Sequence, residues 1–143
     1  MILLDTNVLS ALMRDPPDAV VVGWLDIQAS EQVWTTAVNA FEVRFGLARM
    51  DEGRKRRALE AAFEALLSDD LAGRVAPLDR AAAEAAGLLA ARREAAGRTV
   101  DVRDTLIGGI ALARRMAVAT RNVRHFDDLE TGVLNPWATR GGS

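Results

Sequence analysis

The stretch that decides the fold is Met1-Ile2-Leu3-Leu4-Asp5-Thr6-Asn7, at the start of the chain. Its apolar run ends at an acid and two short polar residues, and helical periodicity begins directly afterwards. This pattern is typical of a short strand buried on both faces, with Asp5 at its carboxyl end. Open α/β sheets place their chemistry at that end of their strands. Asp5 is therefore a candidate ligand or catalyst, and the alternative is that it only caps the next helix.

Composition restricts the chemistry that the chain can perform. The 143 residues suit one domain, and a hydrophobic fraction of 50% with 27% charged residues is ordinary for a globular protein. The absence of Cys and the single His, His125, exclude disulfides, a cysteine nucleophile, zinc sites built from several His and Cys ligands, and phosphoryl chemistry on paired histidines. The 20 Asp and Glu residues remain, and their oxygens suit Mg²⁺ or Mn²⁺.

The charge and the ends of the chain indicate its surroundings. The net charge is −2, but Lys55 is the only lysine, and the many arginines favour bidentate contacts with phosphate. The N-terminus carries no charged leader followed by a long apolar run, and no apolar stretch is long enough to cross a bilayer. We therefore expect a cytoplasmic protein with no membrane association.

Strand-like and helix-like segments alternate along the chain. Short apolar runs predict strands at Ile2–Leu4, Gln32–Thr35, Arg74–Leu78, Met116–Ala119 and Gly132–Trp137. Helical spacing predicts helices at Asn7–Met13, after caps at Asp18 and Thr36, at Asp51–Ser68, at Arg80–Ala96, and from Asp104 onward. The alternation predicts an α/β fold in three layers, with a mostly parallel central sheet and helices on both faces. We expect one domain over residues 1–137 and a flexible tail over 138–143.

Two further carboxylates are predicted to face inward. Glu42 lies on the helix whose inner face we assign to Val38, Phe41 and Phe45, so it stands at the rim of a buried stripe. Asp104 shares a helix face with apolar and small residues that follow it. Like charges packed together raise one another's pKa unless a cation is present. Three inward carboxylates in one small domain therefore indicate a divalent metal.

Two other features allow more than one interpretation. The basic run Arg54-Lys55-Arg56-Arg57 is either a solvated helix face or a surface that binds RNA. The helices at 79–96 and 104–116 are rich in Ala and Gly, and Trp24 and Trp137 lie outside the segments assigned to the core. Those small-residue faces predict self-association into a dimer, or else they pack inside a single chain.

The ordered motifs resemble a known family. Asp5-Thr6-Asn7 after a short first strand looks like the start of a PIN-domain nuclease. Glu42, Asp104 and the run from Thr120 to Phe126 match the later motifs of that family in order. Asn135-Pro136-Trp137 is similar to the closing motif of VapC/FitB-type toxins from bacterial toxin–antitoxin pairs. The resemblance covers essentially the whole chain.

This resemblance implies an activity, a cofactor and partners. It implies a Mg²⁺- or Mn²⁺-dependent endoribonuclease toxin that cuts single-stranded or looped RNA, such as tRNA, and is neutralised by a small antitoxin. It also implies a homodimer, which can join the antitoxin in a larger assembly. The metal ligands would be Asp5, Glu42 and Asp104, with Asn122 completing the catalytic set. The supporting residues would be Thr6, Asn7, Asp101 and Thr120, and Arg103 or Arg121 would hold the RNA phosphate.

One departure from the family pattern keeps other functions open. Many PIN domains have a fourth acid where this chain has Asn122, and Asp127 or Asp128 could substitute only if the turn brings them back. Asn122 favours the alternative of a weak or inactive PIN-like module that binds RNA or a partner. A haloacid dehalogenase-type phosphatase needs an Asp where Asn7 stands. A receiver domain needs a late lysine, and a flap nuclease usually needs a longer chain.

Overall fold

A computed structural model describes residues 1–138 of the chain. Within them, five strands form one parallel sheet in the order β3-β2-β1-β4-β5. The strands are β1 (Ile2–Leu4), β2 (Val33–Thr36), β3 (Val75–Ala76), β4 (Ala117–Ala119) and β5 (Val133–Leu134). β1 is central, so the carboxyl ends of β1, β2 and β4 lie side by side at one edge of the sheet. Of the predicted tail, residues 139–143 lie outside the described residues.

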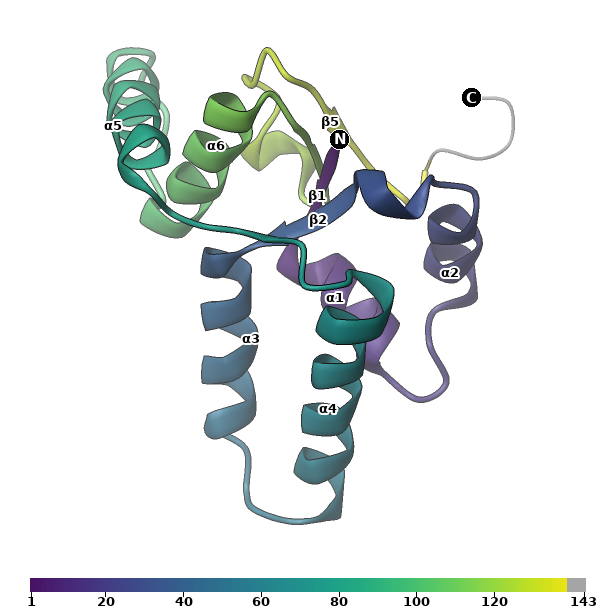
Figure 1. The fold of residues 1–143 in the computed structure, drawn as a ribbon. Coiled ribbons are helices and arrows are strands. Elements are labelled where there is room, and N and C mark those ends of the chain that lie inside the picture. Colours follow the sequence, from purple (N-terminus) through teal and green to yellow (C-terminus); the bar gives the residue numbers. More distant parts are fainter. Residues whose placement is uncertain (139–143) are drawn as a thin grey trace.

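Helices cover both faces of this sheet (Figure 1). They are α1 (Thr6–Met13), α2 (Ala19–Asp26), α3 (Ala37–Ala48), α4 (Arg54–Ala65), α5 (Arg80–Ala95) and α6 (Val102–Arg114). Short helical turns occupy Ser30–Gln32, Leu66–Asp70 and Val123–His125. The predicted three-layer α/β/α architecture with a parallel sheet is confirmed. In residues 1–138 no helix has both the length and the apolar character that a membrane span requires.

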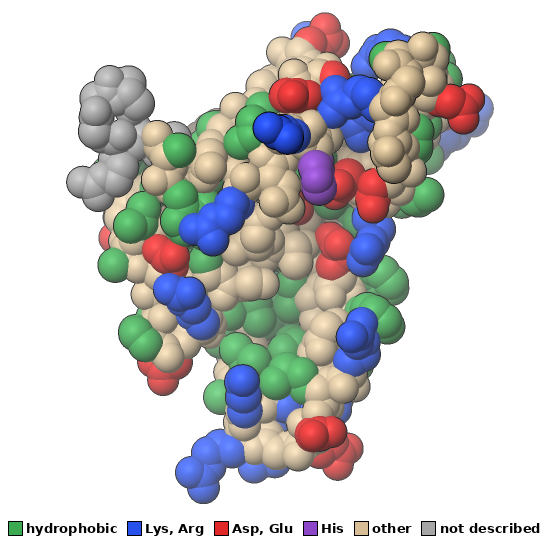
Figure 2. Space-filling model, turned by 180° about the vertical axis from the view of Figure 1, so that it is seen from behind, with side chains coloured by type: hydrophobic (Ala, Val, Ile, Leu, Met, Phe, Trp, Pro, Cys, Tyr) green, Lys and Arg blue, Asp and Glu red, His purple; other side chains and the backbone are tan. Residues whose placement is uncertain are grey.

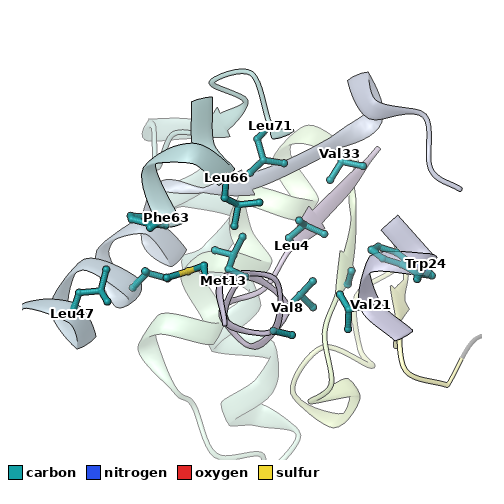
Figure 3. Close-up of a cluster of buried hydrophobic side chains, with 14 residues drawn as sticks. Leu4, Val8, Met13, Val21, Trp24, Val33, Leu47, Phe63, Leu66 and Leu71 are labelled. Atoms are coloured by element: carbon teal, nitrogen blue, oxygen red, sulfur yellow. The ribbon is translucent and has the colours of Figure 1, made fainter. Parts of the chain in front are cut away.

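The hydrophobic core consists of two clusters separated by the sheet. The first gathers side chains from α1, α2, α3 and α4 against β1 and β2, including Leu4, Val8 and Phe63 (Figure 3). The second packs α5 and α6 against the other face, where Leu3 and Val118 point. Successive residues of a strand face opposite sides, so Leu3 and Leu4 contribute to different clusters. This explains why the first strand reads as a continuous apolar run.

Short acidic and hydroxyl side chains begin three of the helices. Asp5, Thr36 and Asp101 are the N-cap residues of α1, α3 and α6, and each side chain accepts a backbone N–H of the first turn. The prediction that Asp104 opens α6 is therefore wrong by two residues. The helix begins at Val102, because Asp101 accepts the N–H of Asp104 at 3.0 Å.

The predicted inner face of α3 is also wrong in part. Phe41 and Phe45 are 59% and 48% exposed, and their rings stack on each other with centroids 6.1 Å apart. The helix instead buries a neighbouring stripe that carries Val43 and Leu47, which face α1 and α4. Both stripes contain apolar residues at helical spacing, so the pattern alone could not choose between them.

The small residues of α5 and α6 are used within the chain. A Cβ added at Gly109 would lie 2.5 Å from the Ala86 Cβ, so these two helices approach too closely for any larger residue. Trp24 is only 7% exposed and belongs to the first core cluster, and Trp137 is half-buried against it. The Ala- and Gly-rich faces and Trp24 therefore give no support to a dimer.

Candidate metal-binding and catalytic site

Asp5 is fixed at the carboxyl end of β1 by neighbouring segments of the fold. The carboxylate is 6% exposed, and Oδ1 accepts the N–H of Thr6 at 2.8 Å. The Thr120 hydroxyl, which follows β4, donates to Oδ2 at 2.7 Å, and the Asn39 amide of α3 donates to Oδ1 at 3.0 Å. Both oxygens thus have directional partners, and none of these partners carries a charge.

Asn39 is the functional residue that sequence reasoning missed. Its side chain is fully buried, and its amide nitrogen donates to Asp5 and to the Thr6 hydroxyl at 3.0 Å each. Its own carbonyl oxygen accepts the Thr36 hydroxyl at 2.6 Å. The available signal was a polar side chain one helical turn before Glu42, on a helix that begins at a strand end.

Glu42 of α3 lies beside Thr6, the first residue of α1. Its Oε1 accepts the Thr6 hydroxyl at 2.8 Å, and its Oε2 lies 3.4 Å from an Arg103 nitrogen. Burial raises the pKa of Glu42, and the negative charges of Asp5 and Asp104 raise it further. The hydrogen bond from Thr6 and the charge of Arg103 oppose this rise without cancelling it.

Asp104 enters from the first turn of α6. Its Oδ2 lies 2.7 Å from Nδ1 of His125, a contact that sequence analysis did not anticipate. Burial raises the pKa of Asp104, and the charges of Asp101 and Asp5 add to the effect, whereas His125 opposes it. Glu42 and Asp104 thus both have raised pKa values, as expected of buried acids that lie near one another without enough cationic charge.

The polar triplet after β4 is tied to the one after β1. Asn7 donates to the Thr120 hydroxyl at 3.2 Å, and its carbonyl oxygen accepts the N–H of Arg121 at 3.0 Å. Thr120 also accepts the N–H of Asn122 at 3.0 Å. The Asn122 side chain is exposed beside this network. Residues more than 110 positions apart in sequence therefore meet at one sheet edge.

The remaining predicted residues lie around this centre. Asp101 is exposed and caps α6, and Arg103 is paired with Glu42. Arg121 is exposed, and its guanidinium lies 3.9 Å from the ring centroid of Trp137. Arg103 contacts the carboxylate of Glu42, whereas the Arg121 side chain lies against Trp137, and all three residues are open to solvent.

Asp127 and Asp128 do not return to the site. Asp127 lies 3.0 Å from Arg98, and both oxygens of Asp128 accept hydrogen bonds of 2.8 Å from Arg93. The Arg93 hydrogen bonds hold the pKa of Asp128 below its ordinary value. The turn therefore directs these acids toward α5, and neither replaces the acid that is missing at Asn122.

The donor set suits a hard divalent cation. Asp5, Glu42 and Asp104 offer oxygen ligands from three elements, and the raised pKa values of the last two report charge that a cation would offset. Within residues 1–138, however, no three acidic or histidine side chains lie close enough together to hold a metal ion as they stand. Glu42 contacts Thr6 and Arg103, and Asp104 contacts His125. Both carboxylates would therefore have to rotate to coordinate the same metal ion.

Comparison with known proteins gives matches over almost the whole chain. The PIN domain family model matches residues 2–131. The chain is 36% identical to the VapC ribonuclease Y4jK of Sinorhizobium fredii and 34% identical to Toxin FitB of Neisseria gonorrhoeae, over 96% of its length and 98% or 99% of theirs. The solved structure of FitAB bound to an IR36 DNA fragment superposes over 100% of both chains, with a TM-score of 0.88 and 33% identity.

Proposed function

We propose that this chain, which belongs to the PIN-domain family, is a divalent-metal-dependent endoribonuclease that acts as the toxin of a toxin–antitoxin pair. The observation that supports the proposal is the raised pKa of Glu42 and of Asp104, to which the charge of Asp5 contributes in both cases. Relatives named as a ribonuclease and a toxin over almost the whole chain supply the reaction class. The substrate would be single-stranded or looped RNA, such as tRNA.

The three carboxylates would hold one Mg²⁺ or Mn²⁺ ion. When bound, such an ion provides Lewis-acid activation of water and offsets charge on the phosphodiester. Thr120 and Asn39 hold the Asp5 oxygens in one orientation, and Thr6 orients Glu42. Asn122 would present an amide oxygen at the edge of the site, with no charge of its own. The partners of Asp5 are all uncharged, so they leave its negative charge available to the metal.

Two arginines would contact RNA. Arg103 lies 3.4 Å from Glu42, and it would exchange this contact for a substrate phosphate when metal satisfies the carboxylate. Arg121 lies over Trp137 beside the Thr120–Asn7 network, with its side chain open to solvent. We assign the scissile phosphate to Arg103 and an adjoining phosphate to Arg121.

An antitoxin would occupy the groove between α1, α3 and α4. A hollow of about 390 Å³ there is lined by Ser10, Met13, Val43, Leu47 and Leu59, and it ends at Thr6 and Glu42. An apolar helix suits such a groove, and an Arg or Lys from its tail could pair with the acids in place of metal. The similar FitAB structure, which was solved on a DNA fragment, supports an antitoxin partner and a larger assembly.

We also propose a homodimer, on a different basis from the small-residue faces. The stacked rings of Phe41 and Phe45 form an exposed apolar patch on α3, next to Glu42. Pairing of two such patches would place two acidic sites on one face. Light scattering should give about twice the 15.4 kDa chain mass. A Phe41→Ser, Phe45→Ser variant should give the single-chain mass, and a variant that keeps the dimer mass would place the interface elsewhere.

The second candidate is a PIN-like module that binds RNA or a partner without cutting, and Asn122 is the residue that favours it. A purified-protein assay separates the two. Wild-type protein should cleave single-stranded RNA with Mg²⁺ and stop when EDTA is added, and Asp5→Asn should not cleave. Binding without cleavage at any Mg²⁺ or Mn²⁺ concentration would support the module. Sequencing RNA 5′ ends after brief induction would then identify the target.

A further inference from the structure

A second hollow opens on the other side of Asp104. It has a volume of about 420 Å³ and lies between the α5–α6 connection and the short helix Val123–His125. Its lining residues are Arg93, Arg98, Thr99, Asp101, Asp104, Arg124 and His125. Asp104 belongs to both this pocket and the carboxylate site, so the two are continuous. On the face drawn in Figure 2, the one histidine lies among acidic and basic side chains.

The pocket is held in shape by two internal arginines. Arg93 is 3% exposed, donates to both oxygens of Asp128, and donates to the backbone carbonyl of His125 at 2.8 Å. Arg98 donates to the backbone carbonyl of Arg124 at 2.7 Å. The segment that carries Arg124 and His125 is therefore fixed to α5 before any ligand arrives. Fixed groups lose little conformational freedom on binding, which favours affinity.

The cation that remains for a ligand is Arg124. Arg93 is neutralised by Asp128, and Arg98 lies within 3.5 Å of both Asp127 and Asp128. Within the part of the chain that the structure describes, the Arg124 guanidinium has no acidic partner, and the residue is exposed. His125 contacts Asp104 through Nδ1, and its half-exposed ring lines the pocket. The group that suits the free guanidinium of Arg124 is an anion, and a strand that passes Asp104 would bring one there.

We infer that this pocket binds the RNA nucleotide next to the scissile bond, with Arg124 contacting its phosphate. The inference rests on the proposed nuclease function and specifies which way the RNA strand leaves the site. A chain cut at the shared carboxylates would continue past Asp104 into the pocket. An arginine fork matches phosphate geometry, and the volume lies in the range of small-ligand sites. Phosphate contacts set the register of the strand, so this pocket would help to fix the cleavage position.

The competing surface is the basic run on α4. Arg56 in that run already donates to Glu60 and to the backbone of Met50. α4 packs on the opposite face of the sheet from α5 and α6, within the first core cluster. Arg57 is exposed like Arg124, and its helix α4 lies well apart from α5 and α6 in Figure 1, which makes it a matched control.

The test measures binding separately from cleavage. A short fluorescein-labelled single-stranded RNA of mixed sequence is titrated in EDTA, at several salt concentrations, with wild type, Arg124→Ala, Arg124→Glu, Arg57→Ala and Arg57→Glu. Arg124→Ala should weaken binding roughly fivefold and reduce the magnitude of the salt slope by about 0.7, the amount for one phosphate of a single strand. Arg124→Glu should weaken it further, and both Arg57 variants should bind as wild type does.

Cleavage assays with Mg²⁺ then locate the effect. Arg124→Ala should raise KM and leave kcat unchanged, because the lost contact is made equally before and during the reaction. Equal losses in the Arg57 variants, or wild-type binding and KM in both Arg124 variants, would overturn the inference. Failure of wild type to cleave would refute the proposed function instead. The EDTA titration would still report on the pocket in that case.

Discussion

Two groups of carboxylates lie near His125, and they differ in their charge partners and in the direction of their pKa shifts. Asp127 and Asp128 meet Arg98 and Arg93, and the pKa of Asp128 is lowered by its hydrogen bonds with Arg93. Glu42 and Asp104 have raised pKa values, chiefly because they are buried and also because other acids are close. The chain has enough arginines to pair every acid near the sheet edge, yet it places the buried one, Arg93, against Asp128.

This difference separates acids that stabilise the fold from acids that are available for chemistry. A carboxylate paired with a buried guanidinium lowers the free energy of the folded state only while both partners remain. A carboxylate that lies close to other carboxylates raises the free energy of the folded state, and a bound cation offsets this repulsion. Perturbed acids of the second kind gather at functional sites in many proteins. Replacing one acid at a time should therefore reveal to which group each belongs.

The largest effect is expected for Asp5→Asn. The substitution keeps the shape of the side chain but removes the charge at the centre of the site, so RNA cleavage should fall by at least about a thousandfold, or about 4 kcal/mol of transition-state stabilisation. Cleavage at saturating Mg²⁺ gives the measurement. The matched control is Asp128→Asn, which should retain activity while folded. Comparable losses in both variants at a temperature where both are folded would erase the distinction between the groups.

The next effect concerns stability and the other group. Asp128→Ala should lower the free energy of unfolding by about 3 kcal/mol at neutral pH, because it leaves the guanidinium of Arg93 buried without its charge partner. Urea denaturation measures the change. Since the folded-state pKa of Asp128 is lowered, its contribution is complete above the ordinary pKa of an aspartate and disappears as pH falls through the folded value. The wild-type and variant stabilities should therefore converge in acid.

A variant that also replaces the arginine tests this reasoning. Arg93→Met combined with Asp128→Ala removes both charges, so it should recover part of the stability lost in Asp128→Ala alone. A double variant as unstable as the sum of its single variants would show that the pair acts through packing and not through charge.

Glu42→Gln and Asp104→Asn should stabilise the folded protein, whereas Asp128→Ala should destabilise it. Their folded-state pKa values are raised, so each acid begins to destabilise the folded chain as pH rises above its ordinary pKa, and the loss is complete above the folded value; the neutral amides should therefore raise the apo-protein Tm at neutral pH. A rise of a few degrees is typical of removing such a site charge. Differential scanning calorimetry with EDTA gives the measurement. Mg²⁺ should raise the Tm of wild type more than that of either variant, and a lower apo Tm in both variants would contradict the comparison.

The sequence predicted the layers of the fold and the parallel character of the sheet because those depend on local patterns. The first strand, its terminal acid and the apolar runs of β2 and β4 are each complete within a few residues. The choice of face on α3 was not local, since two apolar stripes competed and only packing against α1 and α4 selected Val43 and Leu47 over Phe41 and Phe45.

The site shows the same division. The three predicted carboxylates come from the end of β1 and from helices α3 and α6, and their joint binding of a metal remains a prediction. The partners of those acids come from distant segments: Asn39 stands 34 residues from Asp5, and His125 meets Asp104 only because Arg93 fixes the segment that follows β4. No periodicity or capping rule contains that information, so Asn39 and His125 required the structure.

The smallest effect is expected where the chain lacks the acid that many relatives of this fold carry. Asn122 is held by its backbone N–H to Thr120, whose hydroxyl donates to Asp5, so a carboxylate at position 122 would stand close to Asp5 and away from the arginines that pair with Asp127 and Asp128. Asn122→Asp should therefore lower the Mg²⁺ concentration for half-maximal cleavage by about threefold, or about 0.6 kcal/mol, because a charged oxygen attracts the ion more strongly than an amide does. The same variant should lose a little apo stability, since the new charge meets only like charges. Asn122→Ser is the control that keeps a short polar side chain without the charge. An unchanged Mg²⁺ requirement in Asn122→Asp would place this side chain outside the metal site. If the wild type does not cleave RNA and Asn122→Asp does, the natural chain would be the non-cutting module.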